Sequence, residues 1–175
     1  MRAVLELSAE VYTAILKHLL RANPKSEEAG FCFAERTAPE RFKLLEWSLV
    51  ASDEFAYRSL YHIELTDHCR AKVIKRAHDL KASLIEFHSH PLSQQVEFSS
   101  SDQSGFAEFV PYVWWRLKGR PYAAVVVGRS SFDSLIWTAD PSEPDGVLLL
   151  KAGTRMLEPT GRTMSYREDY ESREV

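Results

Sequence analysis

The sequence SLIEFHSHP, residues 83–91, combines an apolar strand pattern with two histidines and an ending that no strand can continue. Residues 83–88 predict a β-strand, since a short apolar run of this kind suits a buried place in a sheet. Pro91 cannot donate a hydrogen bond to a neighbouring strand, so the chain must leave the sheet there. Side chains two residues apart on a strand point to the same face, about 6.6 Å apart. We therefore expect His88 and His90 to converge on one metal ion.

The sequence SSSD, residues 99–102, follows across a loop and opens a predicted helix. The loop can fold back, so that Asp102 joins the two histidines. Two imidazoles and one carboxylate leave one position open for water, a set typical of catalytic zinc. Each part alone has an ordinary explanation, because acidic residues favour helix starts and serines cap helices. The combination is what indicates a site for one Zn²⁺ ion, which would lower the pKa of a bound water to about 7.

Strands and helices interleave along the rest of the chain without a regular βαβ repeat. Helices are predicted after Ser8, over residues 67–81, and from about residue 101 onward, where Pro111 kinks or restarts the helix. Further strands are predicted over residues 4–7, 30–34, 42–51, 61–65, 122–127, 134–138 and 147–151. This order predicts a mixed α/β sheet with helices packed on it.

Composition narrows the class of protein. The chain has 175 residues, a size that suits one domain, and a net charge of -3, which argues against binding to nucleic acid or an anionic membrane through a basic face. Its apolar stretches fall short of the about 20 residues that a membrane helix needs, and Glu6 interrupts any signal peptide. Cys32 and Cys69 lack the CxxC spacing of a zinc site and form no disulfide framework. We expect a cytoplasmic protein.

The two segments together, SLIEFHSHP and Ser-x-x-Asp, resemble the JAMM motif of the JAB/MPN metalloprotease family. The resemblance covers most of residues 8–150, and residues 119–128 (GRPYAAVVVG) are similar to the strand that follows the metal-site helix in prokaryotic members. It implies a single domain over residues 1–158, with a curved mixed sheet flanked by helices and a layering similar to that of cytidine deaminases. The polar residues 159–175 are expected to form a mobile tail.

The resemblance also implies a role for each site residue. It assigns the zinc ligands to His88, His90 and Asp102. Ser99 would help to stabilise the oxyanion that forms when hydroxide attacks a carbonyl. Glu27, three residues before the glycine that opens an apolar strand, would be the general base that takes a proton from the zinc-bound water and passes it to the leaving amine.

Two of these assignments have rivals in the sequence. The loop before Asp102 is one residue longer than is usual in the family, so Ser100 stays open as the oxyanion serine. Glu28 is adjacent to the assigned base, although strand alternation would turn its side chain the opposite way. Glu86 shares a strand face with the histidines and is a geometric rival for the base.

Catalytic members of the family hydrolyse isopeptide or peptide bonds at the C-terminus of ubiquitin or ubiquitin-like proteins. The resemblance therefore implies a ubiquitin-like protein as substrate, with E1-like and E2-like enzymes as associated partners. A non-catalytic MPN scaffold is the alternative from another class, but such scaffolds usually lack a zinc ligand. Further alternatives are a hydrolase of sulfur-carrier protein conjugates and a DNA-associated role, against which the acidic balance argues.

Overall fold

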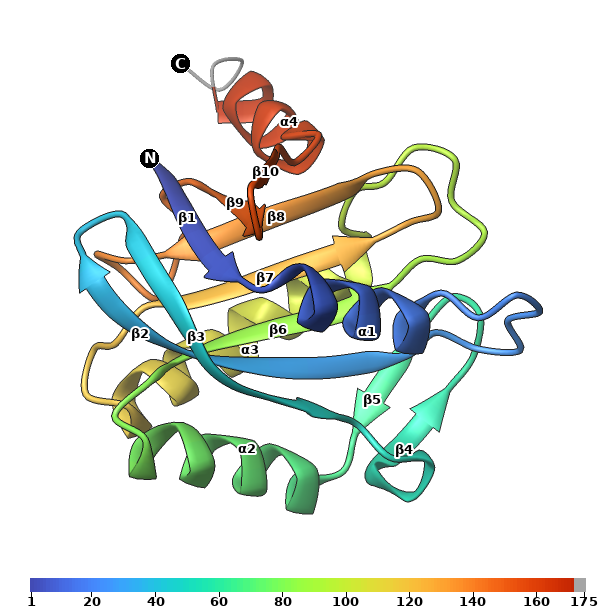
Figure 1. Ribbon diagram of the computed structural model, residues 1–175, viewed down its shortest axis with the longest axis horizontal. Helices are drawn as coiled ribbons and strands as arrows, with labels where there is room; N and C mark the ends of the chain where they lie inside the picture. Colours follow the sequence, from blue (N-terminus) through green and yellow to red (C-terminus); the bar gives the residue numbers. More distant parts are fainter. Residues whose placement is uncertain (172–175) are drawn as a thin grey trace.

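Strand β6 (Ser83–Ser89) forms where the sequence predicts a strand and ends one residue beyond the predicted boundary. The structure is a computed structural model that describes residues 1–171 (Figure 1). β6 is an inner strand, because it pairs antiparallel with β2 (Ala29–Ala38) and parallel with β7 (Tyr122–Val127). Since both edges of its backbone are paired, the face to which each side chain points is fixed.

The main sheet is mixed and curled, which confirms the fold class expected from the sequence (Figure 1). Its strand order is β10-β9-β1-β3-β2-β6-β7-β8. The remaining strands of this sheet are β1 (Arg2–Leu7), β3 (Arg41–Leu49), β8 (Phe132–Trp137), β9 (Val147–Ala152) and β10 (Arg155–Leu157). The curl brings β8 back to β9, where the Ser134 hydroxyl bonds to both the N–H and the carbonyl of Leu148, each at 2.9 Å. These bonds link the edge strand β8 to β9, the strand next to the opposite edge of the sheet.

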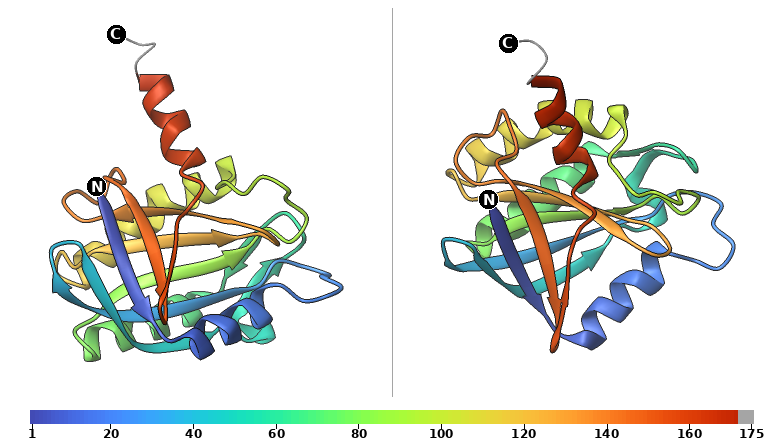
Figure 2. Two further views of the ribbon diagram at one scale, coloured as in Figure 1. Left: turned by 45° about the horizontal axis from the view of Figure 1, so that its top comes forward. Right: turned by 90° about the horizontal axis from the view of Figure 1, so that it is seen from above.

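Helices cover both faces of the sheet, and each face has its own apolar core (Figures 1 and 2). One face carries α1, and the other carries α2 and α3. These helices are α1 (Ala9–Leu19), α2 (Asp67–Asp79) and α3 (Ser100–Arg116). Strand β6 serves both cores, since Ile85 and Phe87 pack under α1 while Leu84 packs under α2 and α3. By alternation, Glu86 and His88 share the face of Leu84.

Side-chain caps fix the starts of the helices. The Ser8 hydroxyl accepts a hydrogen bond from the Val11 N–H at the start of α1, and Thr66 accepts one from the Cys69 N–H at the start of α2. α3 runs through Pro111 as one helix, so the proline does not restart it. None of the described helices has the length and apolar character needed to cross a membrane.

Several short elements were not predicted. These are a 3-10 turn (Ser52–Glu54) and β4 (Phe55–Arg58). β4 pairs with β5 (Ile63–Leu65), which lies within the strand predicted over residues 61–65, and the two form a separate sheet. Within the segment 159–175, expected to be a mobile tail, α4 (Arg162–Glu171) forms a helix that extends away from the sheet (Figure 2). Residues 172–175 of that segment lie outside the described residues.

A buried carboxylate on β8 fastens the first turn of α4. Asp133 is 0% exposed, and its Oδ1 accepts hydrogen bonds from the N–H groups of Ser134 and Gly161, each at 2.9 Å. Its Oδ2 accepts bonds from the N–H and the hydroxyl of Thr163, at 2.9 and 2.7 Å. The Thr163 hydroxyl in turn accepts a bond from the Phe98 N–H in the loop before α3. The start of α4 therefore supports the loop that leads into α3.

Replacing Asp133 with alanine should lower the free energy of unfolding by about 2–4 kcal/mol, because buried donors lose their acceptor. Denaturant unfolding followed by circular dichroism measures the change. The matched control is Glu158→Ala, which removes a 65% exposed carboxylate paired with Arg2 and should change stability by less than about 1 kcal/mol. Equal stability of the two variants would contradict the anchoring role.

Candidate metal centre

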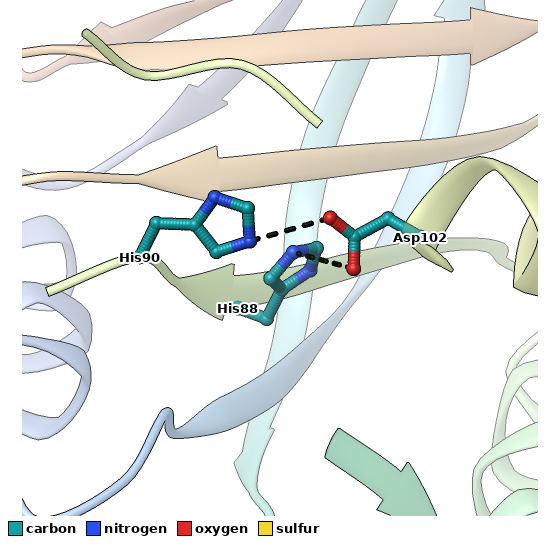
Figure 3. Close-up of side chains that lie close together, drawn as sticks. All are labelled: His88, His90 and Asp102. Atoms are coloured by element: carbon teal, nitrogen blue, oxygen red, sulfur yellow. Dashed lines mark ion pairs between the residues drawn. The ribbon is translucent and has the colours of Figure 1, made fainter. Parts of the chain in front are cut away.

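Three side chains from two separate parts of the chain meet at the C-terminal end of β6 (Figure 3). His88 lies on β6, His90 follows the strand directly, and Asp102 lies in the first turn of α3. The Asp102 Oδ1 lies 3.6 Å from the His88 Nε2, and its Oδ2 lies 3.3 Å from the His90 Nε2. One possible ligand atom from each residue lies within 4.8 Å of the others. These are the predicted ligands, and together they could hold a metal ion.

Backbone and capping contacts fix the two sides of this cluster. The His90 N–H donates to the Val127 carbonyl at 2.9 Å, so pairing with β7 continues past the end of β6. On the other side, the Ser99 hydroxyl accepts a bond from the Asp102 N–H at 3.1 Å and donates to the Asp102 Oδ2 at 2.7 Å. The Ser99 N–H donates to the same oxygen at 2.7 Å. Ser99 thus caps α3 and orients the carboxylate.

Ser99, the residue predicted to stabilise the oxyanion, lies close to the three possible ligands. The residue lines a cavity of about 300 Å³ together with Glu27 and His90, so its hydroxyl lies beside the cluster. Ser100, the rival that the longer loop left open, is exposed on the first turn of α3. The geometry favours Ser99 over Ser100, and the oxyanion role itself stays a prediction.

The pairing of β2 with β6 brings Glu27 to the cluster. Ala29 lies opposite His88 in this antiparallel register, so two residues further out Glu27 comes to lie beside His90. The Glu27 Oε1 lies 3.7 Å from the His90 Nε2, and the side chain is 3% exposed. The carboxylate assigned as base is therefore buried next to the three possible ligands.

Glu28 has a structural role instead. Its carboxylate accepts a hydrogen bond from Arg58 at 2.8 Å and lies 3.4 Å from Arg21. Its N–H donates to the Ser89 hydroxyl, and its carbonyl accepts a bond from the Ser89 N–H, each at 3.0 Å. Ser89 is 0% exposed. The sequence analysis missed Ser89, whose only signal is its place between the two histidines.

Glu86 shares the face of His88, as predicted, but lies behind the imidazole. Its Oε1 is 3.4 Å from the Nδ1 of His88, whereas the Nε2 of that ring faces Asp102. Its Oε2 accepts a hydrogen bond from the Tyr122 hydroxyl at 2.7 Å. Sequence spacing gave no sign of the contact with Tyr122, since the two residues meet through the pairing of β6 with β7.

Burial and charge act against each other at this site. Burial raises the pKa of Glu27, and the two histidines offset part of that increase. Burial disfavours the charged form of His88, but Asp102 and Glu86 outweigh burial and raise the pKa of His88 to about 10. Burial also opposes ionisation of Asp102, yet His88 and His90 hold the pKa of Asp102 well below its usual range. The carboxylates thus favour a positive charge in the cluster.

The His88 ring supplies the observation that most directly fits a metal. Both of its ring nitrogens are buried and have no hydrogen-bond partner among the described residues. The Phe98 ring packs edge-on against it, with the ring centroids 5.7 Å apart. An unpaired buried polar atom costs about 1–3 kcal/mol, so such atoms in a folded protein call for a ligand or a water molecule. A cation bound at Nε2 would satisfy one of them.

A second cavity, of about 420 Å³, reaches the cluster from the side of α3 and β5. His88, Asp102 and Glu86 line it, as does His62, whose Nδ1 lies 3.0 Å from the Ser101 hydroxyl. The sequence analysis assigned no role to His62. Residues of the cluster therefore line two cavities, which leaves space for a substrate beside it.

No family model matches the chain, and no curated protein matches it either. The resemblance to the JAB/MPN family stays a prediction.

Alanine at any one of the three possible ligands should remove bound metal while the fold persists, because two remaining ligands make an incomplete site. Metal analysis after dialysis measures occupancy, and circular dichroism checks folding. The variants are His88→Ala, His90→Ala and Asp102→Ala. The control is His78→Ala on α2, a histidine whose side chain is 53% exposed. Wild-type occupancy in any one of the three would remove that residue from the ligand set.

Proposed function

We propose that this protein is a zinc-dependent isopeptidase or peptidase that hydrolyses the bond at the C-terminus of a ubiquitin-like protein. The observation that carries the proposal is that Glu27, a buried carboxylate, lies 3.7 Å from His90 in the cluster that also contains His88 and Asp102. These are the residues to which the JAB/MPN resemblance assigns the base and the metal. The same resemblance supports a cytoplasmic enzyme that works with E1-like and E2-like partners.

The donor set and its spacing suit zinc. Zinc binds imidazole nitrogen and carboxylate oxygen at about 2.0–2.2 Å in tetrahedral sites, so neighbouring ligand atoms lie about 3.3 Å apart. The Asp102 Oδ1 lies 3.6 Å from the His88 Nε2, and the Asp102 Oδ2 lies 3.3 Å from the His90 Nε2, so each imidazole has one carboxylate oxygen near that distance. His88, His90 and Asp102 would hold the ion and leave its fourth position open. When bound, zinc would supply a Lewis acid that lowers the pKa of water to about 7 and polarises a carbonyl.

Glu27 is suited to move the proton. Its carboxylate lies beside the three ligands rather than among them, and it lines the cavity of about 300 Å³ into which a substrate carbonyl would enter. The Glu27 N–H donates to the Ser59 carbonyl at 2.7 Å, which holds the residue in place. In the proposed reaction, Glu27 accepts a proton from the attacking water and donates it to the leaving amine.

The residues at the rim of this cavity favour a polypeptide as the substrate. Tyr61 and Leu92 line it and are 76% and 53% exposed, and Leu60 lies between strands β4 and β5 beside them. Large apolar side chains exposed around a concave polar site are typical of surfaces that bind a polypeptide. The C-terminal tail of a ubiquitin-like protein has the extended form that such a site can take.

Replacing Glu27 with glutamine should lower kcat by about 10²–10⁴-fold, since glutamine keeps the shape of the side chain but cannot accept the proton. Zinc content should stay at the wild-type level, because Glu27 is not assigned as a ligand. Turnover of a tagged substrate and metal analysis measure the two quantities on one sample.

The matched control is Glu28→Gln at the neighbouring position. Glu28 faces Arg58 and not the cluster, so this variant should keep turnover close to that of the wild type. Full activity of Glu27→Gln together with loss of activity in Glu28→Gln would show that the base has been assigned to the wrong glutamate.

The proposed function is tested by incubating the purified protein with a co-encoded ubiquitin-like protein that carries a C-terminal tag. We expect release of the tag, its loss after treatment with a chelator, and its return when zinc is added. A folded, zinc-loaded protein that cleaves neither such fusions nor conjugates would contradict the proposal and favour a non-catalytic scaffold. Cleavage of a sulfur-carrier conjugate alone would redirect the substrate assignment.

A further inference from the structure

A carboxylate and a tyrosine form a buried pair behind His88. The Glu86 Oε2 accepts the 2.7 Å hydrogen bond from the hydroxyl of Tyr122, whose side chain is 0% exposed. Strand alternation puts Glu86 on the face of His88, and the parallel register, with Leu84 opposite Tyr122, brings the tyrosine to that face. The pair is thus a product of the two inner strands.

The two nitrogens of the His88 ring face two different carboxylates. Nε2 faces Asp102, while Nδ1 lies 3.4 Å from the second oxygen of Glu86, the oxygen that Tyr122 leaves free. A neutral imidazole has one N–H donor and one lone pair, and the partner of one nitrogen decides which role the other takes. The nearest carboxylate to Nδ1 therefore decides whether Nε2 can bind a cation.

We propose that Glu86 is a positioning residue: when the metal binds, its Oε1, now 3.4 Å from the Nδ1 of His88, accepts the Nδ1–H and so leaves the lone pair of Nε2 for the metal, with Tyr122 fixing the orientation of the carboxylate. Metal-bound histidines usually donate their other N–H to a carboxylate, a carbonyl or a water molecule, and losing that partner weakens metal binding. Phe98, packed edge-on against the ring, restrains its tilt. The inference rests on the metal part of the proposed function and not on the substrate.

The alternative is that Glu86 acts on the substrate as a base, since it also lines the 420 Å³ cavity. The two roles differ in what glutamine can replace. A glutamine carbonyl still accepts a hydrogen bond from Nδ1, so a positioning role survives in part, whereas a general base needs the carboxylate. Metal affinity and turnover therefore separate the two roles.

The test measures zinc affinity by competition with a chromogenic chelator, in parallel with turnover. Glu86→Ala should bind zinc about 10–100-fold more weakly than the wild type, Glu86→Gln should recover part of that loss, and Tyr122→Phe should show a smaller loss. The matched control is Glu64→Ala, a 56% exposed glutamate on the wall of the same cavity, which should bind zinc as the wild type does. Thermal unfolding of the metal-free variants checks that each is folded.

A spectroscopic measurement covers the case in which Glu86→Ala does not fold. In the zinc-loaded wild type, ¹⁵N NMR should find the proton of the His88 ring on Nδ1, and a proton on Nε2 would overturn the inference. Wild-type zinc affinity in Glu86→Ala, or normal zinc affinity with lost turnover in Glu86→Gln, would also overturn it.

The two proposals fail in different ways. A wild-type protein that binds zinc but cleaves no ubiquitin-like substrate would contradict the proposed function and leave the role of Glu86 intact. If Glu86→Ala, Glu86→Gln and Tyr122→Phe all bind zinc as tightly as the wild type, and the wild type still cleaves its substrate, the role of Glu86 is contradicted and the proposed function stays intact. A wild-type protein without affinity for zinc would contradict both.

Discussion

The antiparallel pairing of β2 with β6 is the constraint on which the candidate metal centre depends. It sets Ala29 opposite His88, and the two hydrogen bonds between Glu28 and Ser89 continue the contact between the two chain segments just before the first residue of β2. Glu27 is held next to the cluster only because that register holds. The distance in sequence between the buried glutamate and the histidines is thus bridged by ordinary strand pairing, whose hydrogen bonds form whether or not a metal is present.

Gathering charge inside the protein opposes folding, and the surrounding structure offsets that cost. Burying an ionised group is unfavourable unless hydrogen bonds or opposite charges compensate. The Asp102 carboxylate accepts hydrogen bonds from the hydroxyl and the N–H of Ser99, and the Glu28 carboxylate accepts one from Arg58. The nitrogens of His88 make no hydrogen bond and face the carboxylates of Glu86 and Asp102 instead. Two apolar cores, one on each face of the sheet, supply the stability that lets the protein keep these unpaired atoms.

The sequence predicts those features that depend on local periodicity or spacing. The longer strands and the three capped helices show apolar repeats, and the spacing of His88, His90 and Asp102 places them on a strand end and a helix start. The short strands β4 and β10 have too few residues for a period to appear. The contacts of Glu86 with Tyr122 and of Asp133 with Thr163 join residues 36 and 30 positions apart. Such contacts depend on strand register and helix docking, which no local pattern encodes.

Residues without chemical function decide which way the functional side chains point. On β6, Ile85 and Phe87 are 1% exposed and belong to the core under α1, so alternation turns Glu86 and His88 to the face of α3. A shift of one residue in the pairing of β6 would move the histidine into that apolar core and bring Phe87 beside Asp102. Because the shifted arrangement would separate Glu86 from Tyr122 and bury its carboxylate among apolar side chains, the cost of burying an unpaired charge excludes it. The orientation of the metal ligands is therefore fixed by the packing of the opposite face of the sheet.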